Sequence, residues 1–278
     1  LAGIDSGNNL LEVFSMVVLM LGIRRSQAAI YLEPLNTLAS AREILQTLVS
    51  CCGFIGSRKT FQPMQKGQGL VDGLIQSLAL NDSLENREVL RSVLILLADH
   101  ELSPGTLSAR VVASSGGTVH NCIAAALCAT AGIDVGRMYG RVEDFLGHPQ
   151  SGSVLEKRAN KLHAAGQRVP GFDHPLYPKG DPRAALLLDI ARPLCSGSRE
   201  LRSIFDFIDD IKASSALLPR QELAVVVVCR ALGLPRQAAA ALFALGRTSG
   251  WVAHALEQSA SGTLLRPRAQ FVSPSQDN

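Results

Sequence analysis

Residues 84–99 of the chain read Leu84-Glu-Asn-Arg-Glu-Val-Leu-Arg-Ser-Val-Leu-Ile-Leu-Leu-Ala-Asp99. The apolar residues recur every three or four positions, at Leu84, Val89, Leu90, Val93, Leu94 and Leu97. This spacing places them on one face of an α-helix. Asp82 and Glu85 stand where an N-terminal cap and its reciprocal partner are expected. The stretch therefore predicts an amphipathic helix that packs its apolar face against a core.

Similar helical patterns extend in both directions from this stretch. Glycines follow several of them at positions where helices commonly end, and Asp181-Pro182 is typical of a helix start. The expected helices are Leu10–Ile23, Leu107–Ser115, Val119–Ala131, Val135–Leu146, Val154–Ala165, Arg183–Leu194, Arg199–Lys212, Arg220–Leu232 and Pro235–Gln258. The sequence predicts an all-α protein.

One run could form a strand by propensity alone, because Val225-Val-Val-Val228 is entirely β-branched. Pro219, Glu222 and Gly233 bracket a unit of helical length, however, and no hairpin partner lies nearby. We therefore predict a helix here. Residues 147–181 are the least regular part of the chain, and irregular loops of this kind often carry function.

Composition limits the function classes. The chain has 278 residues, a net charge of +3 and 47% hydrophobic residues, so it is long and apolar enough to fold around a sizeable core. Its charges form no runs, which argues against nucleic acid or an anionic membrane as a partner. The apolar window 10–23 contains Glu12 and Ser15 and is shorter than the ~20 residues of a membrane span.

The six cysteines show no metal-ligand spacing, and most lie in apolar stretches. We expect no metal site, a reducing compartment and a cytoplasmic location.

Polar residues with possible chemical roles gather at helix ends and in the irregular loop: His100, His174, Arg183, Arg247 and Arg266. Guanidinium groups bind carboxylates through two hydrogen bonds, and histidine can polarise a carbonyl, so this set suits a small polycarboxylate. The alternative remains open that each histidine is a cap or a surface residue, and that Arg183 is a solvated residue of a first helical turn.

These residues lie within motifs that resemble the citrate synthase family in order and approximate spacing. The motifs are Leu94-Ile-Leu-Leu-Ala-Asp-His100-Glu101, Ala113-Ser-Ser-Gly-Gly117, Val169-Pro-Gly-Phe-Asp-His174, Asp181-Pro-Arg183-Ala, Leu242-Phe-Ala-Leu-Gly-Arg247-Thr-Ser-Gly-Trp251-Val-Ala-His254 and Arg266-Pro-Arg268. The resemblance covers about residues 10–272.

The resemblance implies an all-helical homodimer in which oxaloacetate binds in a cleft between two domains. We expect a large domain of residues 1–136 and 233–278, lacking the family's first N-terminal portion, and a small domain of residues 137–232. The cleft would take oxaloacetate or citrate together with acetyl-CoA or another acyl-CoA. CoA would be a co-substrate, with no cofactor bound permanently.

The resemblance also implies roles for single residues. His100 matches the histidine that binds an oxaloacetate carboxylate, and His174 matches the one that polarises the ketone. Arg183 and Arg247 match arginines that clamp carboxylates, and Arg266 matches one that the partner subunit contributes. The CoA-binding positions correspond to the backbone of Val169, Pro170 and Gly171 and the side chain of Lys179.

Two departures fall on the groups that activate the acetyl methyl. Counted without gaps, the family's Gly-Pro-Leu-His-Gly-Gly segment falls on 132–137, so Val135 replaces the histidine that stabilises the enol; a slip of one residue puts Asp134 there. The family's aspartate base, in Pro-Asn-Val-Asp, falls on Glu222. A carboxylate moved by about 1 Å can cost ~10²-fold in rate, and losing a donor to an enolate costs ~10²–10³-fold.

The sequence thus predicts an acyltransferase of the citrate synthase type that forms citrate and CoA, with Glu222 as the base and His174 as the electrophile. Impaired activity is left open. Two alternatives remain: a non-catalytic relative that senses citrate, oxaloacetate or CoA, and an enzyme that acts on citryl-CoA.

Overall fold

The computed structural model describes residues 10–25, 34–132, 137–149, 151–195, 197–215 and 217–269. Regular secondary structure in these ranges is helical, and the β component is one isolated antiparallel bridge between Phe172 and Pro219. The predicted all-α class is confirmed.

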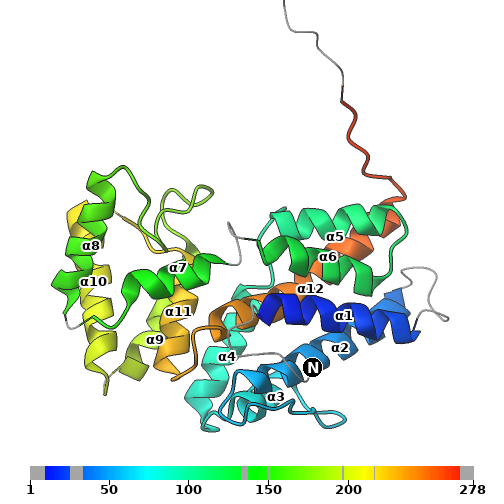
Figure 1. Cartoon of the computed structure of the whole chain (residues 1–278), viewed down its shortest axis with the longest axis horizontal. Helices are drawn as coiled ribbons and strands as arrows, with labels where there is room; N and C mark the ends of the chain where they lie inside the picture. The colour runs from blue at the N-terminus through cyan, green and yellow to red at the C-terminus, as the bar shows by residue number, and fades with distance from the viewer. Residues whose placement is uncertain are drawn as a thin grey trace, which may run out of the picture.

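Twelve α-helices and two short 3₁₀ helices are present in the described ranges (Figure 1). In chain order they are α1 (Leu10–Arg25), α2 (Pro34–Cys51), η1 (Cys52–Phe54), α3 (Leu70–Leu78), α4 (Leu84–Leu96), α5 (Pro104–Ser114), α6 (Val119–Thr130), α7 (Arg137–Leu146), α8 (Gly152–Ala164), α9 (Pro182–Ala191), η2 (Arg192–Cys195), α10 (Arg199–Ser215), α11 (Gln221–Ala231) and α12 (Ala238–Ser261).

The capping predictions had different outcomes at two helices. Asp181 caps α9, because its Oδ1 accepts a hydrogen bond from the backbone N–H of Arg183 at 3.1 Å. At α4 the predicted cap, Asp82, is wrong: Ser83 is the N-cap, and its Oγ accepts from Asn86 N at 3.2 Å. Asp82 instead pairs with Arg87, whose Nη2 lies 2.9 Å from Oδ2.

The run of four valines is helical, as predicted, and lies in α11. Each valine is fully buried. A helix that is apolar on all sides belongs in a protein interior, and α11 packs against α7, α9, α10 and α12. The predicted core helix at residues 10–23 is also confirmed as α1, with Leu11, Phe14 and Val18 fully buried.

The helices form two groups in Figure 1: α7–α11 lie together at the left, and α1–α6 gather around α12 at the right. The turn between α11 and α12 joins the groups and contains Gly233, whose φ is +66°. The proposed boundaries of the two domains stay a prediction. No described helix is both long and apolar enough to cross a membrane.

Two glycines let α12 approach α4 closely. A Cβ on Gly246 would lie 3.0 Å from the carbonyl oxygen of Leu94, and one on Gly250 would lie 2.0 Å from that of Ala98. The end of α4 and the following segment are therefore held against α12, which brings His100 close to Phe243, with the two rings 6.0 Å apart.

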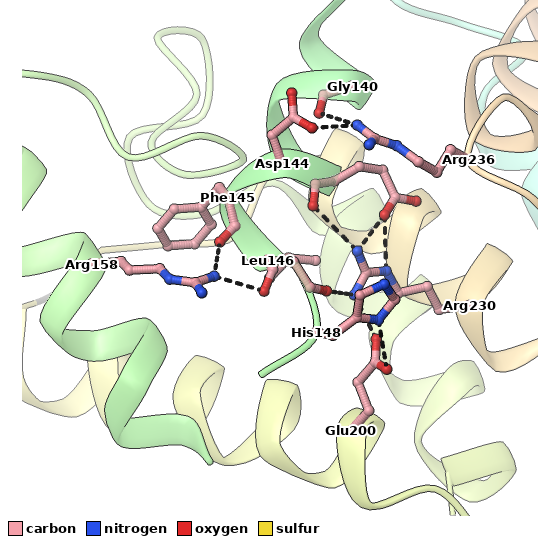
Figure 2. Close-up of polar contacts among 11 residues, drawn as sticks. Gly140, Asp144, Phe145, Leu146, His148, Arg158, Glu200, Arg230 and Arg236 are labelled. Atoms are coloured by element: carbon pink, nitrogen blue, oxygen red, sulfur yellow. Dashed lines mark hydrogen bonds and ion pairs between the residues drawn. The ribbon is translucent and has the colours of Figure 1, made fainter. Parts of the chain in front are cut away.

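Arginines organise the carboxyl end of α7 within the left-hand group (Figure 2). Arg158 donates to the carbonyls of Phe145 and Leu146 at 2.9 and 3.0 Å. Arg230 of α11 donates to Gly147 O at 2.7 Å and pairs with Glu143 and Glu200. These bonds satisfy carbonyls that a helix end leaves free, and they tie α7, α8, α10 and α11 together.

Candidate active site

His174 lies in the loop between α8 and α9, against the segment that leads into α11. The bridge between Phe172 and Pro219 joins these segments, and Asp173 N donates to Leu218 O at 2.9 Å. Arg220 N donates to Gly171 O at 2.8 Å. These contacts fix the start of α11 beside the loop that carries His174.

The His174 ring is buried and held in one orientation. Its Nδ1 accepts a hydrogen bond from the backbone N–H of Leu176 at 3.1 Å. Burial, and next the charge of Arg220, lower the pKa of His174 below its usual value. A neutral ring whose Nδ1 accepts must carry its proton on Nε2. His174 can therefore donate a hydrogen bond from Nε2.

His100 lies edge-on to His174, with ring centroids 5.8 Å apart and an interplanar angle of 84°. Its Nδ1 is 2.7 Å from Nη1 of Arg183. Since arginine only donates, Nδ1 accepts here and Nε2 carries the proton. Burial, followed by the charge of Arg183, lowers the pKa of His100 to about 4. Two neutral imidazoles thus meet at this site.

Arg183, at the start of α9, bridges His100 and Asp181. Its Nε and Nη2 each lie 2.9 Å from a carboxylate oxygen of Asp181. Nη1 also donates to Asp99 O at 3.3 Å. The second oxygen of Asp181 accepts from Gln221 N at 3.1 Å, so this one carboxylate ties α9 to α11.

Arg247 is fully buried in α12 and faces the segment that follows α4. Its Nη1 donates to Ala98 O, and its Nη2 donates to Glu101 O at 3.2 Å and to Thr106 Oγ1 at 2.6 Å. Nε is buried and has no hydrogen-bond partner within the described part of the chain. Burial lowers the pKa of this guanidinium. Arg247 fixes the backbone that carries His100.

Glu222 lies buried in the first turn of α11, where the helix dipole favours a negative charge. Its carboxylate is held by Arg220, with Nη2 to Oε1 at 2.8 Å and Nε to Oε2 at 3.1 Å. The Glu222 charge acts to raise the pKa of His174 and so opposes that of Arg220. His174, Glu222 and Arg220 therefore share one site.

A cavity of about 580 Å³ adjoins His174. Its lining includes His163, Arg168, Val169, Phe172, His174 and Tyr177. Gly171 is buried with a φ of +85°, and a Cβ there would lie 2.9 Å from Cβ of Leu223, so only glycine suits this position. Lys179 is exposed and does not line the cavity.

Arg266 is exposed in the extended segment after α12. The neighbouring Leu265 N donates to Ser114 Oγ at 3.1 Å, at the end of α5. In Figure 1 this segment leaves the right-hand group near the end of α5 and extends upward, away from the group of helices that carries His174. The supposed partner contribution of Arg266 stays a prediction. Val135 lies outside the described residues.

Comparison with known proteins gives a consistent result. The family described as "Citrate synthase, C-terminal domain" matches residues 3–268. The chain belongs to the citrate synthase family. The predicted family, and with it the citrate-synthase-type reaction class, is confirmed.

Individual citrate synthases match over much of the chain. Citrate synthase 2 of Bacillus subtilis is 29% identical over 275 residues, which are 92% of this chain and 70% of that relative. The citrate synthase of Saccharolobus solfataricus is 30% identical over 210 residues, which are 72% of this chain and 56% of that relative.

The fold matches the Thermoplasma acidophilum citrate synthase solved as a ternary complex with carboxymethyl coenzyme A and oxaloacetate. The TM-score is 0.84 at 23% identity, covering 99% of this chain and 76% of the other.

The structure brings together four of the predicted site residues, His100, His174, Arg183 and Glu222. Arg247 holds the backbone on either side of His100. Arg220 is a site residue that none of the sequence motifs identifies. A signal was present, because an arginine two residues before a glutamate at a helix start can form a fork-shaped ion pair with it. The sequence pattern predicts Asp181 only as a helix cap, whereas its carboxylate also binds the Arg183 side chain.

Proposed function

We propose that the protein condenses acetyl-CoA, or another short acyl-CoA, with oxaloacetate to form citrate and CoA. The observation that carries this proposal is the pair of neutral imidazoles, His100 and His174, set edge to face, with His100 hydrogen-bonded to Arg183. The three residues come from separate segments, and each matches a motif of the family. Such a group can hold a carboxylate and polarise a ketone.

In the proposed reaction, Glu222 removes a proton from the α-carbon of the acyl thioester. The electrons of that C–H bond form the enolate, whose charge rests on the thioester oxygen. The α-carbon then bonds to the ketone carbon of oxaloacetate, and the ketone oxygen takes a proton from Nε2 of His174. Glu222 then releases the α-proton to solvent and His174 regains a proton from solvent, so both groups return to their starting states. Water hydrolyses the resulting citryl-CoA to citrate and CoA.

We propose that oxaloacetate lies against His100, with Arg183 and Arg247 as its carboxylate clamps. Arg183 already gives Nε and Nη2 to Asp181 and Nη1 to His100 and Asp99. Binding a substrate carboxylate therefore requires Arg183 to exchange some of these bonds. The same holds for Arg247, which is fully buried against backbone carbonyls.

We propose that acyl-CoA enters along the 169–171 backbone and occupies the cavity beside His174, with Lys179 reaching the CoA from outside the cavity. A homodimer in which Arg266 completes the partner's site is part of the same proposal. The cysteines are all free, and five of the six are buried, which fits a reducing, cytoplasmic setting. The comparisons do not favour a non-catalytic sensor or a citryl-CoA enzyme.

Thiol release from acetyl-CoA, measured with and without oxaloacetate, tests the proposal. We expect release that depends on oxaloacetate and is lost in His174→Ala. His148→Ala is the matched control, because the His148 side chain is 91% exposed and lies outside the site. No release from the wild type, with oxaloacetate or citrate still raising Tm, would contradict condensation and favour the sensor.

A further inference from the structure

Arg220 occupies a position that the motifs did not assign to any role. It directly precedes α11, and its backbone N–H is bonded to Gly171 O, in the proposed CoA-binding segment. Where the family's pattern reads Pro-Asn-Val-Asp, this chain reads Pro219-Arg-Gln-Glu222. The chain therefore has a cation two residues before the proposed base, at the position of an asparagine.

The ion pair with Glu222 engages both carboxylate oxygens. The Arg220 and Glu222 side chains are only 14% and 7% exposed, and Nε and Nη2 each donate to a different oxygen. A fork of this kind fixes the orientation of a carboxylate as well as its position. One hydrogen bond of the pair must weaken when either oxygen accepts a proton.

One nitrogen of the Arg220 guanidinium, Nη1, is not used in the pair with Glu222. No hydrogen-bond acceptor for Nη1 is found among the residues that the structure describes. The Nη1 atoms of Arg183 and Arg247, in contrast, donate to His100 and to Ala98 O. The backbone also holds Arg220 beside the loop that carries His174, through the Phe172–Pro219 bridge and the hydrogen bond from Arg220 N to Gly171 O at 2.8 Å.

The condensation needs a donor at this location. Charge develops on the thioester oxygen when the α-proton leaves, and a positioned donor to such an oxygen is worth ~10²–10³-fold in rate. The histidine that serves the enol in the family falls on Val135 in this sequence, and a valine side chain cannot donate a hydrogen bond.

We infer that Arg220 takes over the stabilisation of the enolate, holding the base with Nε and Nη2 and offering Nη1 to the thioester oxygen. This role rests on the proposed condensation. In this role Glu222 accepts the α-proton and Arg220 stabilises the negative charge on the thioester oxygen. The ion pair fixes the two side chains relative to each other. The chain departs from the family's pattern at a third position, Arg220. The proposed role connects this departure to those at Val135 and Glu222.

Arg220→Gln and Arg220→Lys test the inference in the thiol-release assay. For Arg220→Gln we expect kcat to fall by ~10²–10³-fold, with the KM for oxaloacetate changed by less than about threefold. Arg220→Lys keeps the charge but cannot form the two-pronged ion pair, so its kcat should be about tenfold higher than that of Arg220→Gln. With [²H₃]acetyl-CoA, the isotope effect on kcat should rise in Arg220→Gln, since enolisation becomes slower.

Arg192→Gln is the matched control, because Arg192 forms an exposed fork with Asp209 outside the site. An Arg220→Gln enzyme with the kcat and isotope effect of this control would overturn the inference while leaving the condensation intact. If Arg220→Gln does not fold, a wild-type kcat in Arg220→Lys would overturn it equally. A wild type without oxaloacetate-dependent release would remove the proposed function and the inference together.

Discussion

The site as proposed has two sides, one for the oxo acid and one for the acyl-CoA, and they are built in different ways. On the oxo-acid side, His100, Arg183 and Arg247 come from segments far apart in the chain, and the guanidinium groups are bonded to Asp181 or to backbone carbonyls. On the acyl side, Arg220 and Glu222 are two residues apart at the start of α11 and pair with each other.

The contrast suggests why one side matches the family and the other does not. Arg247 holds the backbone after α4, and Asp181 joins α9 to α11, so changing the oxo-acid side would also disturb the packing of helices. The Arg220–Glu222 pair, in contrast, consists of two neighbouring side chains at one helix start. The hydrogen bonds between these two side chains do not join separate helices.

The largest effect is expected at Arg247. We propose that this residue binds oxaloacetate, and its hydrogen bonds to Ala98 O and Glu101 O also stabilise the fold. Arg247→Ala removes a fully buried side chain and leaves the carbonyls of Ala98 and Glu101 without their donors. We expect the free energy of unfolding to fall by about 3–5 kcal/mol, and oxaloacetate affinity to drop sharply in Arg247→Lys, which keeps the charge. Urea unfolding and oxaloacetate titration measure the two effects.

Arg192→Ala is the control for Arg247, since an exposed ion pair contributes about 1 kcal/mol or less. Equal unfolding midpoints for Arg247→Ala and Arg192→Ala would contradict the claim that Arg247 stabilises the fold. Wild-type oxaloacetate affinity in Arg247→Lys would contradict its proposed role in binding oxaloacetate.

The next largest effect is expected at His174, which the proposed reaction uses at the point where the two substrates join. His174→Ala removes the proposed proton donor to the ketone oxygen, so kcat should fall by ~10²–10⁴-fold. Oxaloacetate affinity should fall as well, whereas His148→Ala should change neither. Steady-state kinetics and oxaloacetate titration provide the measurement, and an unchanged kcat in His174→Ala would remove this residue from the mechanism.

The smallest effect is a pH dependence that His100 confers on stability. Burial, with Arg183, His174 and Arg247 nearby and opposed only by Asp181, lowers the pKa of His100 to about 4. Between about pH 6.5 and 4 the unfolded chain therefore binds a proton that the folded chain does not. The free energy of unfolding should fall by roughly 3 kcal/mol as the pH drops through this window.

His100→Gln should lose this part of the acid destabilisation, and His148→Gln should keep it. Urea unfolding at several pH values gives the comparison. If His100→Gln loses stability with falling pH as steeply as the wild type, His100 is not buried as a neutral ring.

Local patterns allowed much of the fold to be predicted from the sequence. Apolar spacing, glycines and the Asp181-Pro182 start lie within one or two turns of the helices they define, and α11 was recognised in spite of its valines. The cap of α4 was misplaced because Arg87, in the second turn of the helix, engages Asp82 and leaves the cap to Ser83.

The site was only partly predictable, because its geometry depends on contacts between distant segments. The motifs identified His100, His174 and Arg183, and the structure brings them together. The burial of Arg247 against the segment after α4 depends on how α12 packs, which no local pattern reports. The pairing of Arg220 with Glu222 is local, but its meaning depends on the neighbouring His174.

The most direct test of the account follows the acyl carbon into the product. Acetyl-CoA labelled with ¹³C in the methyl group is incubated with oxaloacetate and the protein, and ¹³C NMR identifies what forms. We predict labelled citrate, formed ~10²-fold or more slowly by Glu222→Gln. If no labelled citrate forms, although oxaloacetate raises Tm, the site binds without condensing and the account is contradicted.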